Sequence, residues 1–380
     1  MDYCLSRSTV LFPHLQITSS YHAHDCFPRS TTLASSKSRS SSLVVVASAE
    51  AISSLNTPLE PRSLPGKFLS GVLQNQRQLF HVAVAEQLRD LADDRDAALA
   101  RMNLSYGSSS SSESCLHRRI AELKERECQI AVEDVMYLLI FYKFSEIRVH
   151  LVPRLSRCIY NGRLEIWPAR DWALECIHNF EVLEMIKEHL TTVLGWKPKS
   201  NVTENWATTQ IRRFQLGQIY AASILYGYFL KSASLRHHLE MSLVHTHHDL
   251  PSSNVSGFWS YGLKDLFLGP NCSSQPTSLG EASSRQEEKE EKKLRCYVMG
   301  FDPDTLQRCA KLKSKEAVNL VEKHSCALFG DEKTGLLETD DVISTSFSSM
   351  KRLVLEAVAF GSFLWDTEEY VGSVYNLKEN

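Results

Sequence analysis

Apolar residues recur every three or four positions along most of the chain, which is the spacing of amphipathic helices. The pattern predicts helices over residues 66–102, 115–147, 169–194 and 208–243. One stretch predicts strands instead, because Asn161-Gly162 suits the tight turn of a β-hairpin near residues 158–167. The predicted fold class is therefore mainly α, with two related helical units and this short β-hairpin.

Two parts of the chain resemble each other in the same order. The stretch VLEMIKEH from Val182 matches AVNLVEKH from Ala317. Further on, LYGYFL around Gly227 matches AFGSFL around Gly361. The separation along the chain is nearly the same for both matches and differs by only one position between them. We interpret this agreement as an internal duplication of one helical unit.

Gly227 and Gly361 lie inside very apolar predicted helices. A glycine inside a helix destabilises it by about 1 kcal/mol relative to alanine, so a close approach between helices would be a simple compensation. Both glycines are therefore predicted to be helix-packing residues, at which the two helices contact each other or an identical chain.

Stretches rich in serine, glycine, proline or charge divide the chain into expected parts. We expect a disordered chloroplast transit peptide over residues 1–47 and a first helical domain over 62–248, whose repeat core is 179–231. A flexible linker is expected over 249–294 and a second helical unit, the second copy of the repeat, over 295–372. Asp302-Pro303 is predicted to begin a helix in this second unit.

The first 49 residues carry sixteen Ser or Thr, four basic residues and two acidic ones. They lack the uninterrupted apolar core of a secretory signal peptide. This composition predicts import into the chloroplast, with the stroma as the expected location and cleavage near Ala47. The alternative is the disordered tail of a cytosolic protein.

Composition and charge narrow the function classes further. The formal net charge of −3 excludes a strongly basic nucleic-acid scaffold, so no nucleic-acid partner is expected. None of the ten cysteines forms a CxxC pair, which disfavours a disulfide framework or a zinc site. The seventeen uncharged residues between Arg213 and Lys231 reach about 25 Å as a helix, too short for an integral membrane span, although peripheral membrane contact stays open.

Histidines are the main candidates for chemistry. His189 and His324 occupy the same position in the two matching segments, where each is either a ligand or acid–base group or, as we favour, a partly buried side chain with one partner. His237 and His238 belong to a histidine cluster with plausible metal-ligand spacing, which we interpret as adventitious. These four are weak metal candidates.

No catalytic residue, cofactor-binding residue or cofactor is predicted. The sequence lacks a P-loop, a GxGxxG fingerprint and a GxSxG elbow. Whether the protein is an enzyme stays open at this point, and the absence of these motifs favours a protein that is not one.

Four long stretches carry a family resemblance. They begin GKFLSGVLQNQ at Gly66, AVEDVMYLLIFYKF at Ala131, ASILYGYFLKSASL at Ala222 and KRLVLEAVAFGSFLWD at Lys351. Together they resemble the plant UV-B-induced chloroplast protein family, which carries a domain of unknown function. The resemblance implies a plastid protein named for its expression response, and it brings no catalytic residues to this chain.

The expected function is that of a soluble, helical, non-catalytic stromal protein in a stress or light response, which binds other plastid proteins or itself. Two alternatives stay open. One is an enzyme or a ligand- or metal-binding protein with a pocket between helices near His189 or His324. The other is a peripheral thylakoid protein.

Overall fold

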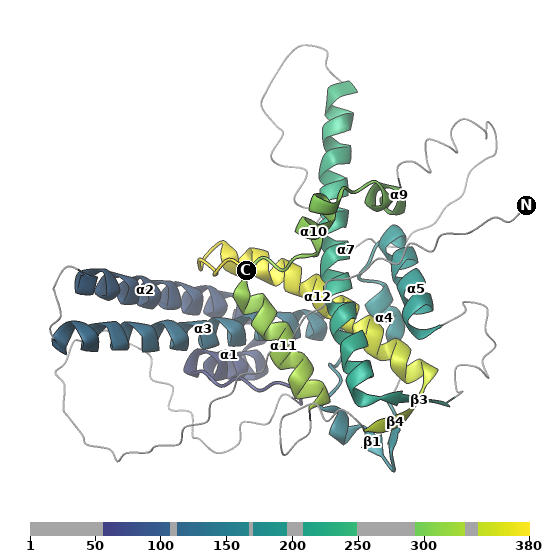
Figure 1. The fold of residues 1–380 in the computed structure, drawn as a ribbon, viewed down its shortest axis with the longest axis horizontal. Helices are drawn as coiled ribbons and strands as arrows, with labels where there is room; N and C mark the ends of the chain where they lie inside the picture. Colours follow the sequence, from purple (N-terminus) through teal and green to yellow (C-terminus); the bar gives the residue numbers. More distant parts are fainter. Residues whose placement is uncertain (1–55, 107–111, 167–169, 196–207, 249–292, 331–340) are drawn as a thin grey trace, which may run out of the picture. The chain divides into compact units, whose positions relative to one another are not determined.

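The computed structural model describes residues 56–106, 112–166, 170–195, 208–248, 293–330 and 341–380. The predicted transit peptide, nearly all of the predicted linker and the end of the predicted hairpin beyond Ile166 lie outside the described residues. Within them most residues are helical, which confirms the predicted mainly α fold (Figure 1).

The helices of the described residues follow in chain order. They are α1 (Leu64–Asn75), η1 (Arg77–Leu79), α2 (Phe80–Tyr106), α3 (Ser112–Glu146), η2 (Leu155–Arg157), α4 (Asp171–Glu175), α5 (Phe180–Leu194), α7 (Arg213–His248), α9 (Leu294–Met299), α10 (Pro303–Ala310), α11 (Lys315–Phe329) and α12 (Phe347–Gly372).

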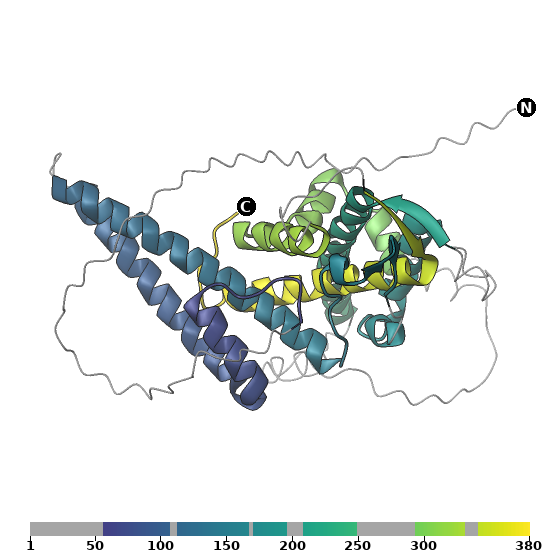
Figure 2. The ribbon, with the colours of Figure 1, turned by 90° about the horizontal axis from the view of Figure 1, so that it is seen from below.

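Helices α2 and α3 lie side by side as a long hairpin, here called the arm, and α1 packs against its base (Figures 1 and 2). Asp134 of α3 accepts hydrogen bonds from the Ser63 backbone N–H at 2.7 Å and the Ser63 hydroxyl at 2.6 Å, and the same hydroxyl caps α1. A Cβ on Gly66 would lie 2.7 Å from Asp134 Oδ2, so glycine permits this close contact.

The predicted single helix over 66–102 is wrong, because the chain leaves the helical conformation at Gln76, where φ is −141° and ψ is 54°. The break lets α1 fold back against the arm. Leu69 and Leu73 thereby enter the core, whereas a straight helix would carry them away from it.

Within the described ranges, four short strands form one sheet in the order β1-β2-β4-β3. Strands β1 (Ile159–Tyr160) and β2 (Arg163–Leu164) make the predicted hairpin, with Asn161 at φ 50° and Gly162 at φ 73°. Strand β4 (Val342–Ser346) pairs in parallel with β2 and antiparallel with β3 (Thr208–Arg212). The predicted helix over 208–243 therefore begins as a strand, because these residues pair with a segment far away in sequence.

Helices α7 and α12 cross in direct backbone contact (Figure 1). A Cβ on Gly227 would lie 2.7 Å from the carbonyl carbon of Val358, and a Cβ on Gly361 would lie 2.7 Å from the backbone nitrogen of Tyr228 and still closer to the Ile224 carbonyl oxygen. The structure thus places the two glycines of the sequence analysis at one helix crossing.

The contacts at this crossing are reciprocal. Gly227 touches Val358, and Gly361 touches Ile224. The alignment that equates Gly227 with Gly361 also equates Ile224 with Val358, so each contact is the counterpart of the other. The same alignment equates Gln210 with Ser344, and these two residues form the central pair of the antiparallel β3–β4 ladder. The pattern is that of a local two-fold axis.

The hydrophobic core draws on both predicted units. It includes Tyr220 and Ile224 from α7, Leu320 from α11 and Phe360 from α12, all at most 1% exposed, together with the inner half of α3. Residues from the predicted first domain and second unit therefore share one buried cluster.

Replacing either crossing glycine by alanine tests the backbone contact. We expect Gly227→Ala and Gly361→Ala each to lower the free energy of unfolding by about 3 kcal/mol or more, because the new Cβ meets backbone that cannot move aside. Urea unfolding followed by circular dichroism measures the change.

The matched control is Gly71→Ala in α1, where a Cβ would meet nothing within 4 Å. This variant should gain up to about 1 kcal/mol from helix propensity. Unchanged stability of both crossing variants would contradict the close contact.

Candidate functional site

Charged residues enter the core on α12. Strand β4 ends at Ser346, whose hydroxyl accepts a hydrogen bond from the Ser349 N–H and so begins the helix. Apolar residues then surround the helix on several sides, and Arg352 and Glu356 are only 4% and 0% exposed. Because burying a charge without partners is very unfavourable, each of these side chains requires a specific environment.

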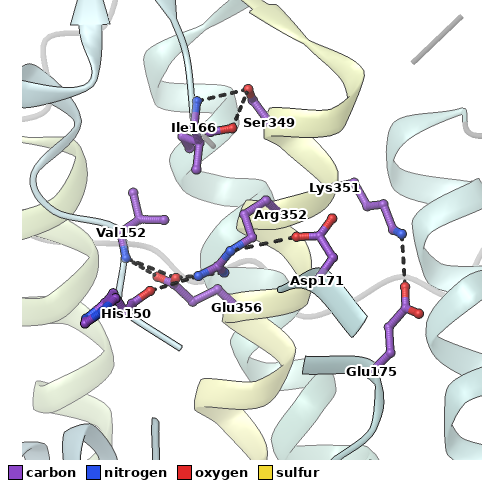
Figure 3. Close-up of polar contacts among 9 residues, drawn as sticks. All are labelled: His150, Val152, Ile166, Asp171, Glu175, Ser349, Lys351, Arg352 and Glu356. Atoms are coloured by element: carbon purple, nitrogen blue, oxygen red, sulfur yellow. Dashed lines mark hydrogen bonds and ion pairs between the residues drawn. The ribbon is translucent and has the colours of Figure 1, made fainter. Parts of the chain in front are cut away.

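Arg352 and Glu356 form an ion pair one helical turn apart, with 2.9 Å between Arg352 Nη1 and Glu356 Oε2 (Figure 3). Arg352 also donates to the His150 carbonyl at 2.8 Å, and its Nε lies 3.9 Å from an Asp171 carboxylate oxygen. The Val152 N–H donates to Glu356 at 3.0 and 3.1 Å.

Two further side chains of α12, which do not belong to the ion pair, bind residues that follow Val152 in the chain (Figure 3). The Ser349 hydroxyl accepts from the Ile166 N–H at 3.1 Å and lies 3.4 Å from the Ile166 carbonyl. Lys351 pairs with Glu175 at 2.9 Å. The backbone groups of His150, Val152 and Ile166 lie outside the helices and strands of the described residues, so side chains of α12 supply the partners that a helix or a ladder would give elsewhere.

The cluster continues from Glu356 into α7 and α11. The Tyr220 hydroxyl donates to Glu356 Oε1 at 3.4 Å and lies 2.9 Å from Nε2 of His324. The His324 ring also stacks on Phe360, with 4.4 Å between ring centroids. One connected set of polar groups, here called the α12 cluster, therefore joins α7, α11, α12 and the segment 150–166.

Burial dominates the protonation of this cluster. It raises the pKa of Glu356, against the opposing effects of Arg352 and the Val152 amide, and raises the pKa of Tyr220 well above its usual value. It lowers the pKa of His324 to about 3. His324 is therefore neutral at neutral pH, which suits hydrogen bonding and packing better than proton transfer.

His189 and His324 lie on different helices with different partners, whereas His237 and His238 are neighbours on α7 with 6.2 Å between ring centroids. His189 lies 3.0 Å from the Ser223 hydroxyl and stacks on Tyr226 with ring centroids 4.3 Å apart, and burial lowers its pKa to about 4. It occupies in α5 the place that His324 occupies in α11. In the second histidine group, His237 is buried and packs against Tyr297 with 4.8 Å between ring centroids, whereas His238 is exposed.

Over the ranges that the structure describes, no group of three or more His, Cys, Asp or Glu residues is placed to hold a metal ion. In the same ranges no helix has an apolar stretch long enough to cross a membrane.

Arg352, Glu356 and Tyr220 were not among the site residues predicted from the sequence. A signal for the first two was present, since two opposite charges four residues apart stand within an otherwise apolar run. Their partners were not foreseeable, because they come from irregular backbone that lies far earlier in the chain.

A surface hollow of about 580 Å³ lies beside α7 and includes residues of α9 and α10. Its lining includes Arg236, Glu240, Tyr297 and Phe301. Arg236 donates to the Glu240 carboxylate at 2.9 Å and to the Tyr297 hydroxyl at 3.1 Å. Both polar and aromatic groups are thus presented to solvent in this feature, here called the α7 hollow.

Comparison with known proteins identifies a domain family within the chain. The family model described as a protein of unknown function (DUF760) matches residues 115–243, which run from the arm to α7. No solved structure matches the chain.

A UV-B-induced chloroplast protein of Arabidopsis thaliana is 38% identical to the chain over 334 residues, which is 85% of this chain and 78% of the relative. The chain belongs to the family of this plant UV-B-induced chloroplast protein, as the resemblance in the sequence implied.

Removing one partner of the buried ion pair tests the α12 cluster. We expect Glu356→Leu to lower the free energy of unfolding by about 3–5 kcal/mol, because Arg352 is left buried without its carboxylate. The double variant Arg352→Met/Glu356→Leu should recover much of this loss. Urea unfolding measures all three proteins.

The matched control is Glu188→Gln, which removes a surface ion pair of 3.1 Å with Arg295. Its expected effect is below about 1 kcal/mol. Equal effects of Glu356→Leu and Glu188→Gln would contradict the importance of the buried pair.

The buried histidine predicts a dependence of stability on pH. With the pKa of His324 at about 3 in the folded chain and 6.5 as its ordinary value, the unfolded chain binds more protons between these limits. The stabilisation by neutral His324 is complete above pH 6.5 and is lost as the pH falls towards 3.

We therefore expect His324→Gln to be less stable than wild type at pH 7.5, with the difference closing by about 1.4 kcal/mol per pH unit below pH 6.5. Urea titrations at a series of pH values measure it. His238→Gln, at an exposed position, should follow the wild-type curve. A difference in the free energy of unfolding between His324→Gln and wild type that stays constant over this pH range would contradict the lowered pKa of His324.

Proposed function

We propose that this chain is a non-catalytic interaction protein of the chloroplast stroma, which binds other plastid proteins in the response to UV-B or light. The Arabidopsis relative, a UV-B-induced chloroplast protein, supports the proposed compartment and the proposed response. The serine-rich, acid-poor composition of residues 1–47 supports a transit peptide.

The observation that carries the binding role is the apolar surface next to the α7 hollow. Leu239 and Leu243 on α7 are 67% and 62% exposed. The two leucines are one helical turn apart and so lie on one face of α7. An apolar surface bordered by Arg236 and Glu240 has the composition of a protein-binding surface, with an apolar centre and a polar rim.

The α12 cluster supports a structural role better than a catalytic one. Both oxygens of Glu356 lie within hydrogen-bond distance of the Val152 N–H, and Arg352 is occupied by Glu356 and the His150 carbonyl. These groups are used in holding the segment 150–166 against α12. His189 and His324 are likewise used in packing and hydrogen bonding between helices.

The organisation that we propose with this function is a duplication, with the repeat core at 179–231 in the first helical domain and its second copy in the unit 295–372. Besides the matching residues, it is supported by the reciprocal contacts of Gly227 and Gly361 and by the ladder centred on Gln210 and Ser344. The same helix start also occurs twice, with Asn179 capping α5 and Ser314 capping α11.

Affinity capture from chloroplast extract at physiological salt tests the binding role. We expect wild-type protein to retain a reproducible set of plastid proteins and Leu239→Lys/Leu243→Lys to lose most of that set, because two charges disrupt the apolar face. Mass spectrometry quantifies each retained protein.

The matched control, Leu116→Lys/Leu123→Lys, introduces the same charges at two exposed leucines of the arm and should retain the set. The absence of any specific partner of the wild type, or identical recovery by all three proteins, would contradict the proposed function.

A further inference from the structure

The outer edge of β3 has no partner strand among the described residues. The sheet order makes β3 an edge strand, and four of its five residues are exposed. Gln210 pairs with Ser344 of β4, whose N–H points away from β3 and donates to the Gly162 carbonyl of the hairpin at 3.0 Å. Directly opposite residues of an antiparallel pair either bond to each other or both point away, so the backbone groups of Gln210 also face away from β4. They form part of a template on which another strand can pair.

The equivalent edge of β4 is occupied. The local two-fold axis through Gln210 and Ser344 relates β3 and α7 to β4 and α12. Under this relation the outer edge of β3 corresponds to the edge of β4 that β2 covers in parallel, with Arg163 beside Ser344 and Leu164 beside Thr345. The hairpin that supplies β2 precedes α5, whereas α9 and α10 precede α11. In the part of the chain that the structure describes, one of two equivalent positions is thus filled and the other is open.

The burial of the two strands differs in the way that a missing neighbour explains. On the side that faces the core, Ile343 and Thr345 of β4 are 2% and 0% exposed. Their counterparts on β3 under the axis are Thr209, which is exposed, and Ile211, which is half-buried at the margin of the core. Leu164 of β2 is fully buried beside Thr345. An aliphatic side chain beside Ile211 would therefore bury apolar surface that β3 leaves open.

The charge at the end of β3 indicates the next residue of a partner strand. Continuing the register of β2 by one residue places the counterpart of Glu165 beside Arg212. Arg212 is exposed, and among the described residues its guanidinium group has no hydrogen bond or ion pair. An acidic side chain at this position would complement it. The β3 strand of a second copy cannot supply this charge, because residues 208–212 include no acidic residue.

We propose that the outer edge of β3 binds an extended segment of another protein, which adds a parallel strand to the sheet as β2 does at β4. The segment carries an aliphatic residue beside Ile211 and an acidic residue beside Arg212. Arg212 directly precedes α7, whereas Leu239 lies in the last third of this helix, so the edge is separate from the apolar surface next to the α7 hollow. The proposal does not depend on the function proposed for that surface.

A peptide with the sequence of residues 161–168, NGRLEIWP, is a suitable probe, because the equivalent edge of β4 accepts part of this sequence. Fluorescence anisotropy of the labelled peptide, titrated with the full chain up to about 300 µM, measures binding. We expect saturable binding with a Kd of about 100 µM or tighter. The same peptide with Leu164→Lys should bind at least about tenfold more weakly, because its charge would lie beside Ile211.

A proline at position 210 tests whether the peptide binds to this edge. Gln210→Pro removes the N–H that points outward and leaves the ladder with β4, to which that N–H does not contribute. This variant should weaken peptide binding at least about tenfold. The matched control is Gln210→Ala, which keeps the N–H and should bind the peptide like wild type. Circular dichroism establishes that both variants are folded.

Charge reversal tests the register and the direction of the added strand. Arg212→Glu should weaken binding of the peptide about threefold, and the peptide with Glu165→Lys should recover this loss on the same variant. Leu239→Lys/Leu243→Lys, which alters only the other surface, should bind the unchanged peptide like wild type.

Absence of binding by the wild-type chain at about 300 µM would overturn the proposal, as would equal binding by Gln210→Pro and wild type. Failure of the reversed charges to recover binding would overturn the parallel register. A wild-type dimer in sedimentation velocity that Gln210→Pro dissociates would assign the edge to a second copy instead. None of these results decides the capture experiment on α7.

Discussion

The backbone contact between α7 and α12 is the constraint on which the other features depend. Two helices approach this closely only where neither carries a side chain at the point of contact, which Gly227 and Gly361 provide. Each helix directly follows a strand, so the crossing brings β3 and β4 together as a ladder. It also places the Tyr220 hydroxyl of α7 within hydrogen-bond distance of Glu356 of α12. The same hydroxyl contacts His324, so α11 is connected to this crossing as well.

The α12 cluster determines how the segment 150–166 attaches to this pair of helices. An apolar surface would accept this segment in several alignments, whereas Glu356, Arg352 and Ser349 each bind one particular backbone group. Buried ion pairs contribute little net stability compared with apolar residues of the same shape. Their benefit here is that they select a single alignment of the segment against α12.

Elements with local signals were predictable from the sequence. Periodicity predicted the helical parts of the chain but missed the breaks at Gln76 and between α4 and α5. Asn161-Gly162 predicted the hairpin, and Asp302-Pro303 predicted the start of α10. The β3–β4 ladder was missed because its strands are short and their partners lie far apart in sequence. The Arg352–Glu356 pair was missed for a similar reason. Its role in holding the segment depends on the Val152 N–H and the His150 carbonyl, which only the tertiary structure brings to it. The two glycines were identifiable because their unfavourable helix propensity needed a compensation.

The long sequence separation across the α7–α12 crossing has a consequence for the order of events in folding. Residues near 227 and 361 meet only after the intervening chain has been made, and contacts between distant residues slow folding. Until α12 is available, Ile224 and Tyr228 of α7 have no partner surface for a face that is buried in the finished protein. A nascent chain therefore exposes an aggregation-prone helix while the residues between α7 and α12 are being made, and α7 is the segment that a chaperone would have to cover during that interval.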